Sequence, residues 1–340
     1  MKQLRVAIIG CGAIAKKRHA LACDEMEGVS LVGVCDVSLE SAEALAQKYG
    51  AKAFSDIDEM LDCTSPDCVC VCTPAGSHAA ISSHCLQKGM DVLCEKPMAT
   101  NAEDAKEMMR VSQATGKRLM VAFSNRAYTE HRLMKELLQA GRIGKPLMFK
   151  TSLEDPGVEN LIGCDAGEFY DRMKGSPDGA MNGMGCHRVD LIRYLFDSPI
   201  AEIFSCYAAL DKRYSNGEPI DVDDTALAIM KLENGVVGTF STSWCNYGPG
   251  ELGTEIYGTR GLLRYRGEDK VELWNGKDCE TFSYHKDLAE KNGHGIVRNF
   301  LSACMGKEEP ITICMDGVEC MMALEASARS AKAGAWARIK

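Results

Sequence analysis

The chain has 340 residues, of which 46% are hydrophobic and 26% are charged, and its formal net charge is -9. This length exceeds one ordinary domain and predicts two, each large enough to bury its own core. The negative charge argues against nucleic acid or an anionic membrane as the main partner, because both favour a basic surface. The negative net charge does not exclude a small anionic cofactor, because backbone N–H groups can bind pyrophosphate.

Neither a membrane span nor a signal peptide is expected. The apolar start Met1–Gly12 is broken by glycines, and no apolar run reaches ~18 residues. The 17 cysteines include no Cys-x-x-Cys pair, and Cys68, Cys70 and Cys72 alternate along an expected strand without other ligand types at suitable spacing. We therefore expect reduced, buried thiols, no metal site and a cytoplasmic location.

The first half of the chain alternates short apolar runs with amphipathic segments, which predicts alternating strands and helices. The expected strands are Leu4–Ile9, Ser30–Asp36, Ala53–Phe54, Cys68–Cys72, Asp91–Cys94 and Leu119–Phe123. The expected helices are Ile14–Met26, Leu39–Tyr49, Ile57–Leu61, His78–Lys88 and Ala102–Thr115. Parallel strands joined by helical crossovers form a doubly wound sheet, with a ligand crevice at the carboxyl ends of the strands.

From about Leu147 the pattern changes to extended segments separated by hairpin signals such as Glu233-Asn-Gly235. The expected strands are Leu147–Leu153, Ile200–Ala209, Thr225–Leu232, Val236–Trp244, Glu255–Gly258, Gly261–Arg266 and Val271–Trp274. Helices are expected at His187–Leu195 and at Asp316–Lys332, the latter packing on either domain. The prediction is an α/β Rossmann domain at residues 1–124, followed at 125–340 by an α+β domain for substrate binding and oligomerisation, with a large, mostly antiparallel open sheet.

The first expected βα turn reads Gly10-Cys-Gly12-Ala-Ile-Ala15. The first glycine permits the tight turn, the second lets the backbone approach a pyrophosphate, and the final alanine allows close packing of helix and strand. This context predicts a dinucleotide-binding turn, and its cofactor-binding residues are Gly10, Gly12, Ala13 and Ile14.

Asp36 is expected at the end of the second strand, 36 − 10 = 26 residues after the first glycine of the turn. A carboxylate at this point binds the adenosine ribose hydroxyls of a dinucleotide. It also repels a 2′-phosphate, and the following Val37-Ser38-Leu39 supplies no arginine to neutralise one. NAD is therefore the expected cofactor, with NADP disfavoured.

Two further motifs close expected strands at the crevice, Cys72-Thr73-Pro74-Ala-Gly-Ser-His78 and Cys94-Glu95-Lys96-Pro97. Together with Gly185-Cys-His187-Arg-Val-Asp190 and Val222-Asp-Asp-Thr225, they resemble the Gfo/Idh/MocA family of NAD(P)-dependent sugar and polyol oxidoreductases. The resemblance extends over essentially the whole chain.

This resemblance implies hydride transfer between a secondary alcohol and nicotinamide. It implies that Lys96 binds the substrate hydroxyl and the nicotinamide ribose, and that His187 is the acid/base. The chemistry agrees, because alcohol oxidation needs a base tuned near neutral pH and a cation that stabilises the developing alkoxide. Further cofactor-binding residues are then Thr73, Pro74, His78, Glu95 and Lys96. Substrate-binding residues are Lys96, Asn125, Arg126, Asn182 and His187.

The chain departs from the family at Gly183, where sugar and inositol dehydrogenases commonly have an aspartate four residues before the histidine. The nearest polar replacement is Asn182, and Asp178 or Asp165 could reach in from the loop. The loop Asp155–Gly179, with aromatic Phe169 and Tyr170, covers a sugar site or forms an oligomer contact. Simple glucose or inositol dehydrogenation is therefore in doubt.

The favoured function is an NAD-dependent dehydrogenase acting on a sugar, glycoside, inositol or related polyol. One alternative is a redox-neutral, NAD-dependent glycosidase or eliminating enzyme that passes through a keto-sugar. Another is a non-catalytic NAD or sugar sensor, which is disfavoured because Lys96 and His187 are both kept. By resemblance, the open sheet of the second domain forms a homo-oligomer, a dimer or a tetramer.

Overall fold

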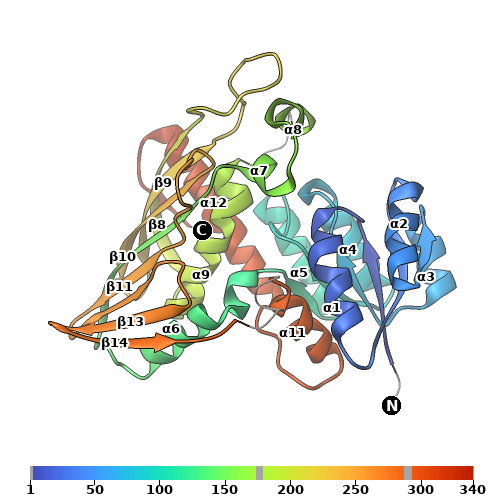
Figure 1. Ribbon diagram of the computed structural model, residues 1–340, viewed down its shortest axis with the longest axis horizontal. Coiled ribbons are helices and arrows are strands. Elements are labelled where there is room, and N and C mark those ends of the chain that lie inside the picture. The colour runs from blue at the N-terminus through green and yellow to red at the C-terminus, as the bar shows by residue number, and fades with distance from the viewer. Residues whose placement is uncertain (1–2, 174–178, 287–292, 340) are drawn as a thin grey trace. The chain divides into compact units, whose positions relative to one another are not determined.

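A computed structural model describes residues 3–173, 179–286 and 293–339 of the chain. The chain divides into two compact units (Figure 1). The first comprises Met1–Tyr128 and Asp287–Val318, and the second comprises Thr129–Lys286 and Glu319–Lys340. The domain boundary expected between residues 124 and 125 stays a prediction.

The first unit contains, within its described residues, a six-stranded parallel sheet of order β3-β2-β1-β4-β5-β6. Its strands are β1 (Leu4–Ile9), β2 (Val29–Cys35), β3 (Lys52–Phe54), β4 (Cys68–Val71), β5 (Asp91–Cys94) and β6 (Leu119–Val121). The helical segments between them are η1 (Ala15–His19), α1 (Ala20–Glu25), α2 (Leu39–Tyr49), α3 (Ile57–Thr64), η2 (Ala75–Ser77), α4 (His78–Gln87) and α5 (Ala102–Thr115). This order confirms the doubly wound sheet, and its strand order reverses between β1 and β4, where such sheets bind dinucleotides.

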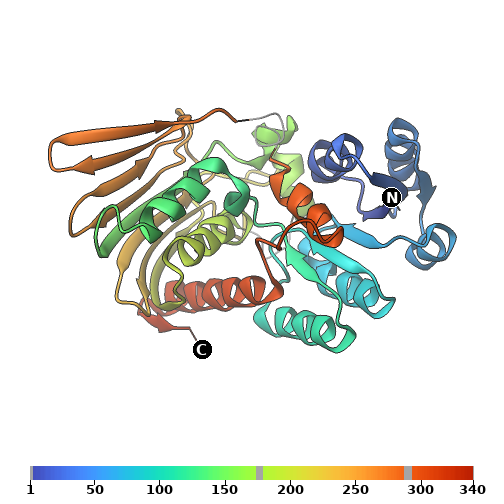
Figure 2. The ribbon, with the colours of Figure 1, turned by 90° about the horizontal axis from the view of Figure 1, so that it is seen from below.

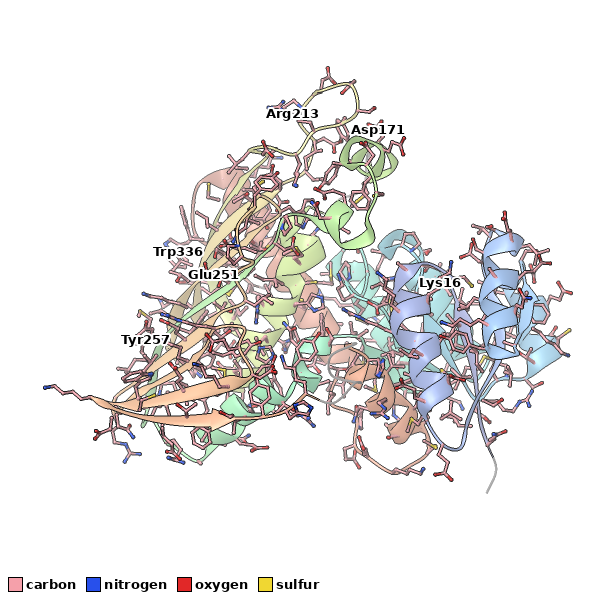
Figure 3. All side chains as sticks on the ribbon, viewed as in Figure 1. Lys16, Asp171, Arg213, Glu251, Tyr257 and Trp336 are labelled. Atoms are coloured by element: carbon pink, nitrogen blue, oxygen red, sulfur yellow. The ribbon has the colours of Figure 1, made fainter. Side chains whose placement is uncertain are left out.

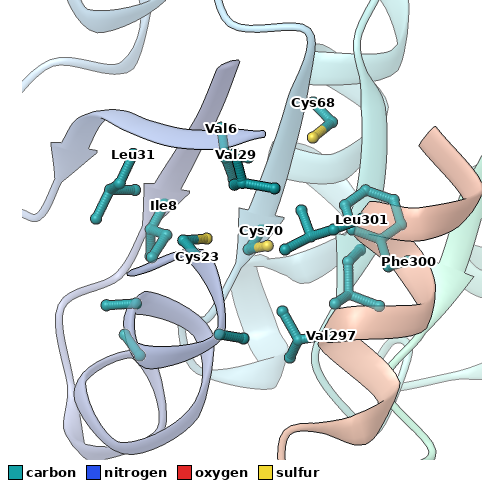
Figure 4. Packing of buried hydrophobic residues seen from close by; sticks show 14 of the residues in the cluster. Val6, Ile8, Cys23, Val29, Leu31, Cys68, Cys70, Val297, Phe300 and Leu301 are labelled. Atoms are coloured by element: carbon teal, nitrogen blue, oxygen red, sulfur yellow. The ribbon is translucent and has the colours of Figure 1, made fainter. Parts of the chain in front are cut away.

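The core of the first unit joins strands from the start of the chain to a helix from near its end (Figure 4). Val6 and Ile8 of β1 belong to one buried cluster with Cys70 of β4 and with Phe300 and Leu301 of α11 (Gly295–Cys304). The sequence did not predict α11. Two more helical segments, η3 (Ser124–Ala127) and the start of α12 (Cys314–Ala333), belong to this unit.

The second unit contains, in the part of the chain that is described, a nine-stranded sheet of order β14-β13-β12-β11-β7-β10-β9-β8-β15. Its strands are β7 (Pro146–Glu154), β8 (Ile200–Ala208), β9 (Thr225–Leu232), β10 (Val237–Ser243), β11 (Thr254–Gly258), β12 (Leu262–Tyr265), β13 (Lys270–Asn275), β14 (Asp278–Ser283) and β15 (Ala337–Arg338). Neighbouring strands are antiparallel except β7 and β10, which are parallel. The prediction of a large, mostly antiparallel sheet is therefore confirmed.

Helices cover one face of this sheet (Figure 2). They are α6 (Thr129–Gln139), α9 (Cys186–Phe196) and the second-unit part of α12, whose Ser327 hydroxyl lies 2.7 Å from that of Ser205 on β8. Strand β9 accordingly alternates, with Ala226, Ala228 and Met230 buried. Residues of opposite parity therefore point to the other face of the sheet.

The expected long loop Asp155–Gly179 contains two helices, α7 (Val158–Ile162) and α8 (Ala166–Met173), while residues 174–178 lie outside the described part of the chain. Tyr170 is 1% exposed, and its ring centroid lies 5.9 Å from that of Trp244. The Tyr170 ring belongs to the interior of the second unit, and whether this segment covers a sugar site or forms an oligomer contact stays a prediction.

No helix in the described residues combines the length and the apolar character that crossing a membrane requires. The same residues contain no group of three or more His, Cys, Asp or Glu side chains placed to hold a metal ion. The cysteines are free thiols, and Cys68, Cys70 and Cys94 are completely buried.

Candidate functional site

The glycine turn after β1 combines a crowded position with an open one. Gly10 has a φ of 91°, and a Cβ there would lie 2.7 Å from the carbonyl carbon and oxygen of Cys72. A Cβ at Gly12 would meet nothing within 4 Å. The backbone at Gly12 is thus free for the close approach that a pyrophosphate makes, and the next residues, Ala13 and Ile14, are exposed.

Asp36 follows β2, and two backbone groups orient its carboxylate. Its Oδ2 accepts a hydrogen bond from the Cys11 N–H at 2.7 Å, and its Oδ1 accepts one from the Ser38 N–H at 2.9 Å. Each carboxylate oxygen keeps acceptor capacity for a hydroxyl, and Val37 beside it is fully exposed. This geometry fits a dinucleotide with free ribose hydroxyls.

The loop after β4 carries Thr73 and Pro74. The Thr73 hydroxyl accepts a hydrogen bond from the Ser77 hydroxyl at 2.8 Å, and Pro74 is exposed. His78, also predicted to bind the cofactor, is 1% exposed, and its two ring nitrogens contact the carbonyl oxygens of Thr73 and Pro97. The His78 side chain therefore contacts the backbone of the loops that follow β4 and β5.

Glu95 and Lys96 follow β5. Glu95 is buried, and its Oε1 lies 2.9 Å from Nε2 of His19, while its Oε2 accepts the N–H of Lys96 at 3.1 Å. Burial alone raises the pKa of the Glu95 carboxyl, but the hydrogen bond and charge of His19 and the charges of Lys96 and Arg18 outweigh it and lower that pKa to about 2. The carboxylate is therefore ionised and fixes the backbone at the half-buried Lys96.

Asn125 and Arg126 lie on η3 and are 8% and 7% exposed. The Arg126 guanidinium forms a bidentate ion pair with Asp316 on α12, at 2.8 and 3.0 Å, and donates to the carbonyl of Ile311 at 3.2 Å. Its charge is thus already neutralised inside the first unit.

His187 lies on the helix that begins at η4 (Met181–Gly185) and continues as α9. Asn182, Gly183 and His187 are all partly exposed. Gly183 and His187 are four residues apart and therefore share one side of the helix. A Cβ at Gly183 would contact only Cζ2 of Trp244, at an ordinary 3.6 Å, so a larger residue can occupy that position.

Asp223 holds the start of this helix, a role that the sequence did not reveal. Its Oδ2 accepts the Met181 N–H at 2.8 Å, and its carbonyl accepts the Ala180 N–H at 2.7 Å. A Cβ at Gly179 would lie 2.1 Å from its Oδ1, so only glycine fits there. Burial outweighs the hydrogen bond from Met181 and raises the pKa of Asp223 to about 6.

A buried ion pair fixes the segment that holds α7. Nζ of Lys212 lies 2.6 Å from both Oε1 of Glu159 and the carbonyl oxygen of Pro156, and the Tyr170 hydroxyl donates to Oε2 of Glu159 at 2.7 Å. Asp165, a possible replacement for the aspartate missing at 183, accepts the N–H of Glu168 at the start of α8. Asp178, the second loop aspartate considered as such a replacement, lies outside the described residues.

A doubly wound sheet with an open glycine turn and a carboxylate after β2 is typical of an NAD(P)-binding domain. Residues 4–123 match the oxidoreductase family with an NAD-binding Rossmann fold, and residues 131–264 match the GFO/IDH/MocA C-terminal domain. The chain belongs to the Gfo/Idh/MocA family.

Similar proteins include sugar dehydrogenases. Glucose-6-phosphate 3-dehydrogenase of Bacillus subtilis is 28% identical over 77% of this chain and 74% of its own length. D-glucoside 3-dehydrogenase of Escherichia coli is 30% identical over 71% of this chain and 70% of its own. The WlbA dehydrogenase of Bordetella pertussis, solved with NADH and UDP-GlcNAcA, is 26% identical with a TM-score of 0.81 over 99% of both chains.

Proposed function

We propose that this protein is a dehydrogenase that prefers NAD to NADP and oxidises a secondary alcohol of a sugar, glycoside, inositol or related polyol. The proposal rests above all on Lys96, whose backbone the buried Glu95 carboxylate holds at the carboxyl edge of the first-unit sheet. The open turn at Gly12 and the oriented carboxylate of Asp36 fit a dinucleotide at that same edge.

Each side chain has a distinct role in the proposed reaction. Bound NAD supplies the hydride acceptor. The Lys96 ammonium donates a hydrogen bond to the substrate oxygen and stabilises the negative charge that develops there as the C–H bond breaks. His187 takes the hydroxyl proton, so one hydride and one proton leave the alcohol and a ketone forms.

The relatives support a sugar-like substrate, because two of them are named as dehydrogenases of a sugar phosphate and of a glucoside. The redox-neutral alternative begins with the same oxidation but regenerates NAD before product leaves. It therefore predicts product without net NADH. The expected cytoplasmic location stays a prediction.

A panel of sugars, glycosides and polyols, monitored by NADH absorbance and by mass spectrometry of products, tests the proposal. We expect NADH formation with at least one class, and a fall of roughly 10²- to 10⁴-fold in kcat for Lys96→Ala and for His187→Ala. NAD affinity should survive His187→Ala. The control is His84→Ala, which removes a partly exposed histidine of α4.

Near-normal turnover in His187→Ala would show that the acid/base lies elsewhere. Product formation without NADH would favour the redox-neutral reaction. No oxidation of any panel member, with NAD bound, would contradict dehydrogenation of these substrates.

A further inference from the structure

His78 is the first residue of α4 and is 1% exposed. Its Nδ1 lies 2.8 Å from the carbonyl oxygen of Pro97, and its Nε2 lies 2.7 Å from the carbonyl oxygen of Thr73. Both distances are those of good hydrogen bonds. Both ring nitrogens of one buried histidine thus contact backbone carbonyls.

This arrangement determines the protonation of the ring. A carbonyl oxygen can only accept, whereas neutral imidazole has one N–H and one bare nitrogen that itself accepts. Either neutral tautomer would therefore point a nitrogen lone pair at a carbonyl oxygen less than 3 Å away. Only the imidazolium, with two N–H groups, satisfies both contacts.

The surroundings of the ring favour the same state. Burial alone lowers the pKa of His78, but the neighbouring Cys94 sulfur and the carbonyls of Pro97 and Thr73 raise it to about 9. Cys94 of β5 is the titratable group that faces the ring, and it is completely buried. Within the described residues, the ring nitrogens otherwise hydrogen-bond to the two carbonyl oxygens, which carry no proton.

The ring joins two loops of the candidate cofactor site. Thr73 follows β4, and Pro97 follows Lys96 after β5. These neighbouring parallel strands end at the same edge of the sheet. One buried side chain therefore links the loop with Thr73 to the loop with Lys96, and at 1% exposure it offers almost no surface to a ligand.

We propose that His78 is a positioning residue that is charged at neutral pH, a buried imidazolium that bridges the loops after β4 and β5 and so places Lys96 for cofactor and substrate. The part that concerns Lys96 rests on the proposed function. The charge of the ring does not, because it follows from the two carbonyl contacts alone.

The charge is tested by NMR of protein labelled with ¹⁵N in the histidine rings. His78→Gln assigns the resonances of His78, and His84→Gln assigns those of His84, the second histidine of α4. We expect both His78 nitrogens to stay protonated through pH 8, whereas an ordinary histidine loses one proton near 6.5. Deprotonation of His78 at or below pH 7 would overturn the proposal, whatever the protein's activity.

The positioning role is tested by NAD binding and kinetics in His78→Gln, with His84→Gln as the matched control. Glutamine is neutral, and its side-chain oxygen would face one of the two carbonyls. Because a hydrogen bond from a charged group contributes more than a neutral one, we expect NAD binding about tenfold weaker or more, and kcat/KM reduced at least as much. Normal NAD affinity and kcat/KM in a folded His78→Gln would overturn it.

The pH dependence of NAD affinity separates the effect of the charge on the His78 ring from the effect of its shape. Wild-type NAD affinity should fall as the pH rises through about 9, where the ring loses its charge, and this alkaline decline should be absent from His78→Gln. An identical decline in both proteins would assign it to another group and contradict the role of the charge. Should wild-type protein bind no NAD at all, the proposed function fails, while the ring spectra still decide the charge.

Discussion

The carboxylate of Asp36 belongs to a turn that leaves it little freedom. The Cys11 and Ser38 N–H groups both donate to it and hold its orientation. We expect NAD to bind at least tenfold more tightly than NADP, and Asp36→Ala combined with Val37→Arg to narrow or reverse that preference. Fluorescence titrations with NADH and NADPH measure both affinities, with Asp62→Ala as an exposed control. Equal affinity of wild type for both would contradict this.

Gly183 is the second residue whose effect can be measured. A Cβ there meets only Trp244 at an ordinary distance, so Gly183→Asp should fold. Wild type has no carboxylate at position 183, so a substrate hydroxyl that donates a hydrogen bond there lacks its acceptor, at a cost of ~1–3 kcal/mol. Wild type should therefore prefer a glycoside to its free sugar in kcat/KM, and Gly183→Asp should lower that ratio. Gly183→Ala, which adds a methyl without an acceptor, is the control.

Individual residues differ in how far the sequence reveals them. Gly10, Gly12 and Asp36 are recognisable because their spacing is set within one strand–turn–helix–strand unit. His19 gives no such signal, because its partner Glu95 is 76 positions away and the pair exists only after folding. Asp223 lay in a recognised motif, yet its role as a helix cap depends on close approach to Gly179.

The helix that starts at η4 carries the candidate acid/base, His187, and the buried carboxyl of Asp223 holds the start of this helix. The pKa of Asp223, raised to about 6, exceeds the ordinary aspartate value of ~3.9, so the native state binds this proton more tightly than the unfolded chain. The resulting stability is present at low pH and is lost as the pH rises through about 6. Asp223→Asn, which keeps an acceptor for the Met181 N–H, should gain Tm relative to wild type between pH 4 and pH 8.

Calorimetric melting over this pH range measures the difference. Asp165→Asn is the matched control, because Asp165 caps α8 from an exposed position in the same unit. A wild-type-minus-variant difference in Tm that does not change with pH would show that Asp223 is ionised throughout.

Helices and strands were predicted well where apolar residues recur at regular spacing along the segment. Five strands of the first unit read as short apolar runs, and β1, α2, β5 and α5 have the predicted bounds. Helices α6, α7, α8 and α11 were not predicted. The segments of α7 and α8 are rich in Gly, Asp and Glu, and they are held by contacts such as the Lys212–Glu159 pair, between residues 53 positions apart. Contacts of this kind, between residues far apart in the sequence, stabilise α7 and leave no local pattern from which to predict it.

At the scale of the whole molecule, the uncovered face of the second-unit sheet stands out. Leu227 and Ile229 of β9 and Val237 of β10 are 55%, 43% and 40% exposed. Neighbouring strands and loops add a groove of about 890 Å³, whose lining includes both apolar and charged side chains. Figure 3 labels Tyr257 of β11 and Glu251, which pairs with Glu154 of β7 through an isolated bridge. Contiguous apolar surface of this kind is typical of protein interfaces.

We expect a second copy of the chain to cover this face. Arg266 and Glu255 of the groove already pair with each other at 3.1 Å, so the expectation rests on the exposed apolar side chains of Leu227 and Ile229. We therefore expect a homo-oligomer, measured by size-exclusion chromatography with light scattering.

Substitution of this face should separate the copies while leaving the fold intact. Leu227→Asp and Ile229→Asp place charges on the outward side of β9, whereas the core residues Ala226, Ala228 and Met230 point the other way. Burying such a charge without a partner is costly, so dissociation should become at least tenfold more favourable. Leu39→Asp, at a 45% exposed position in the first unit, should have no such effect. A monomeric wild-type chain, or an oligomer that survives both substitutions, would remove the sheet face from consideration as the contact between copies.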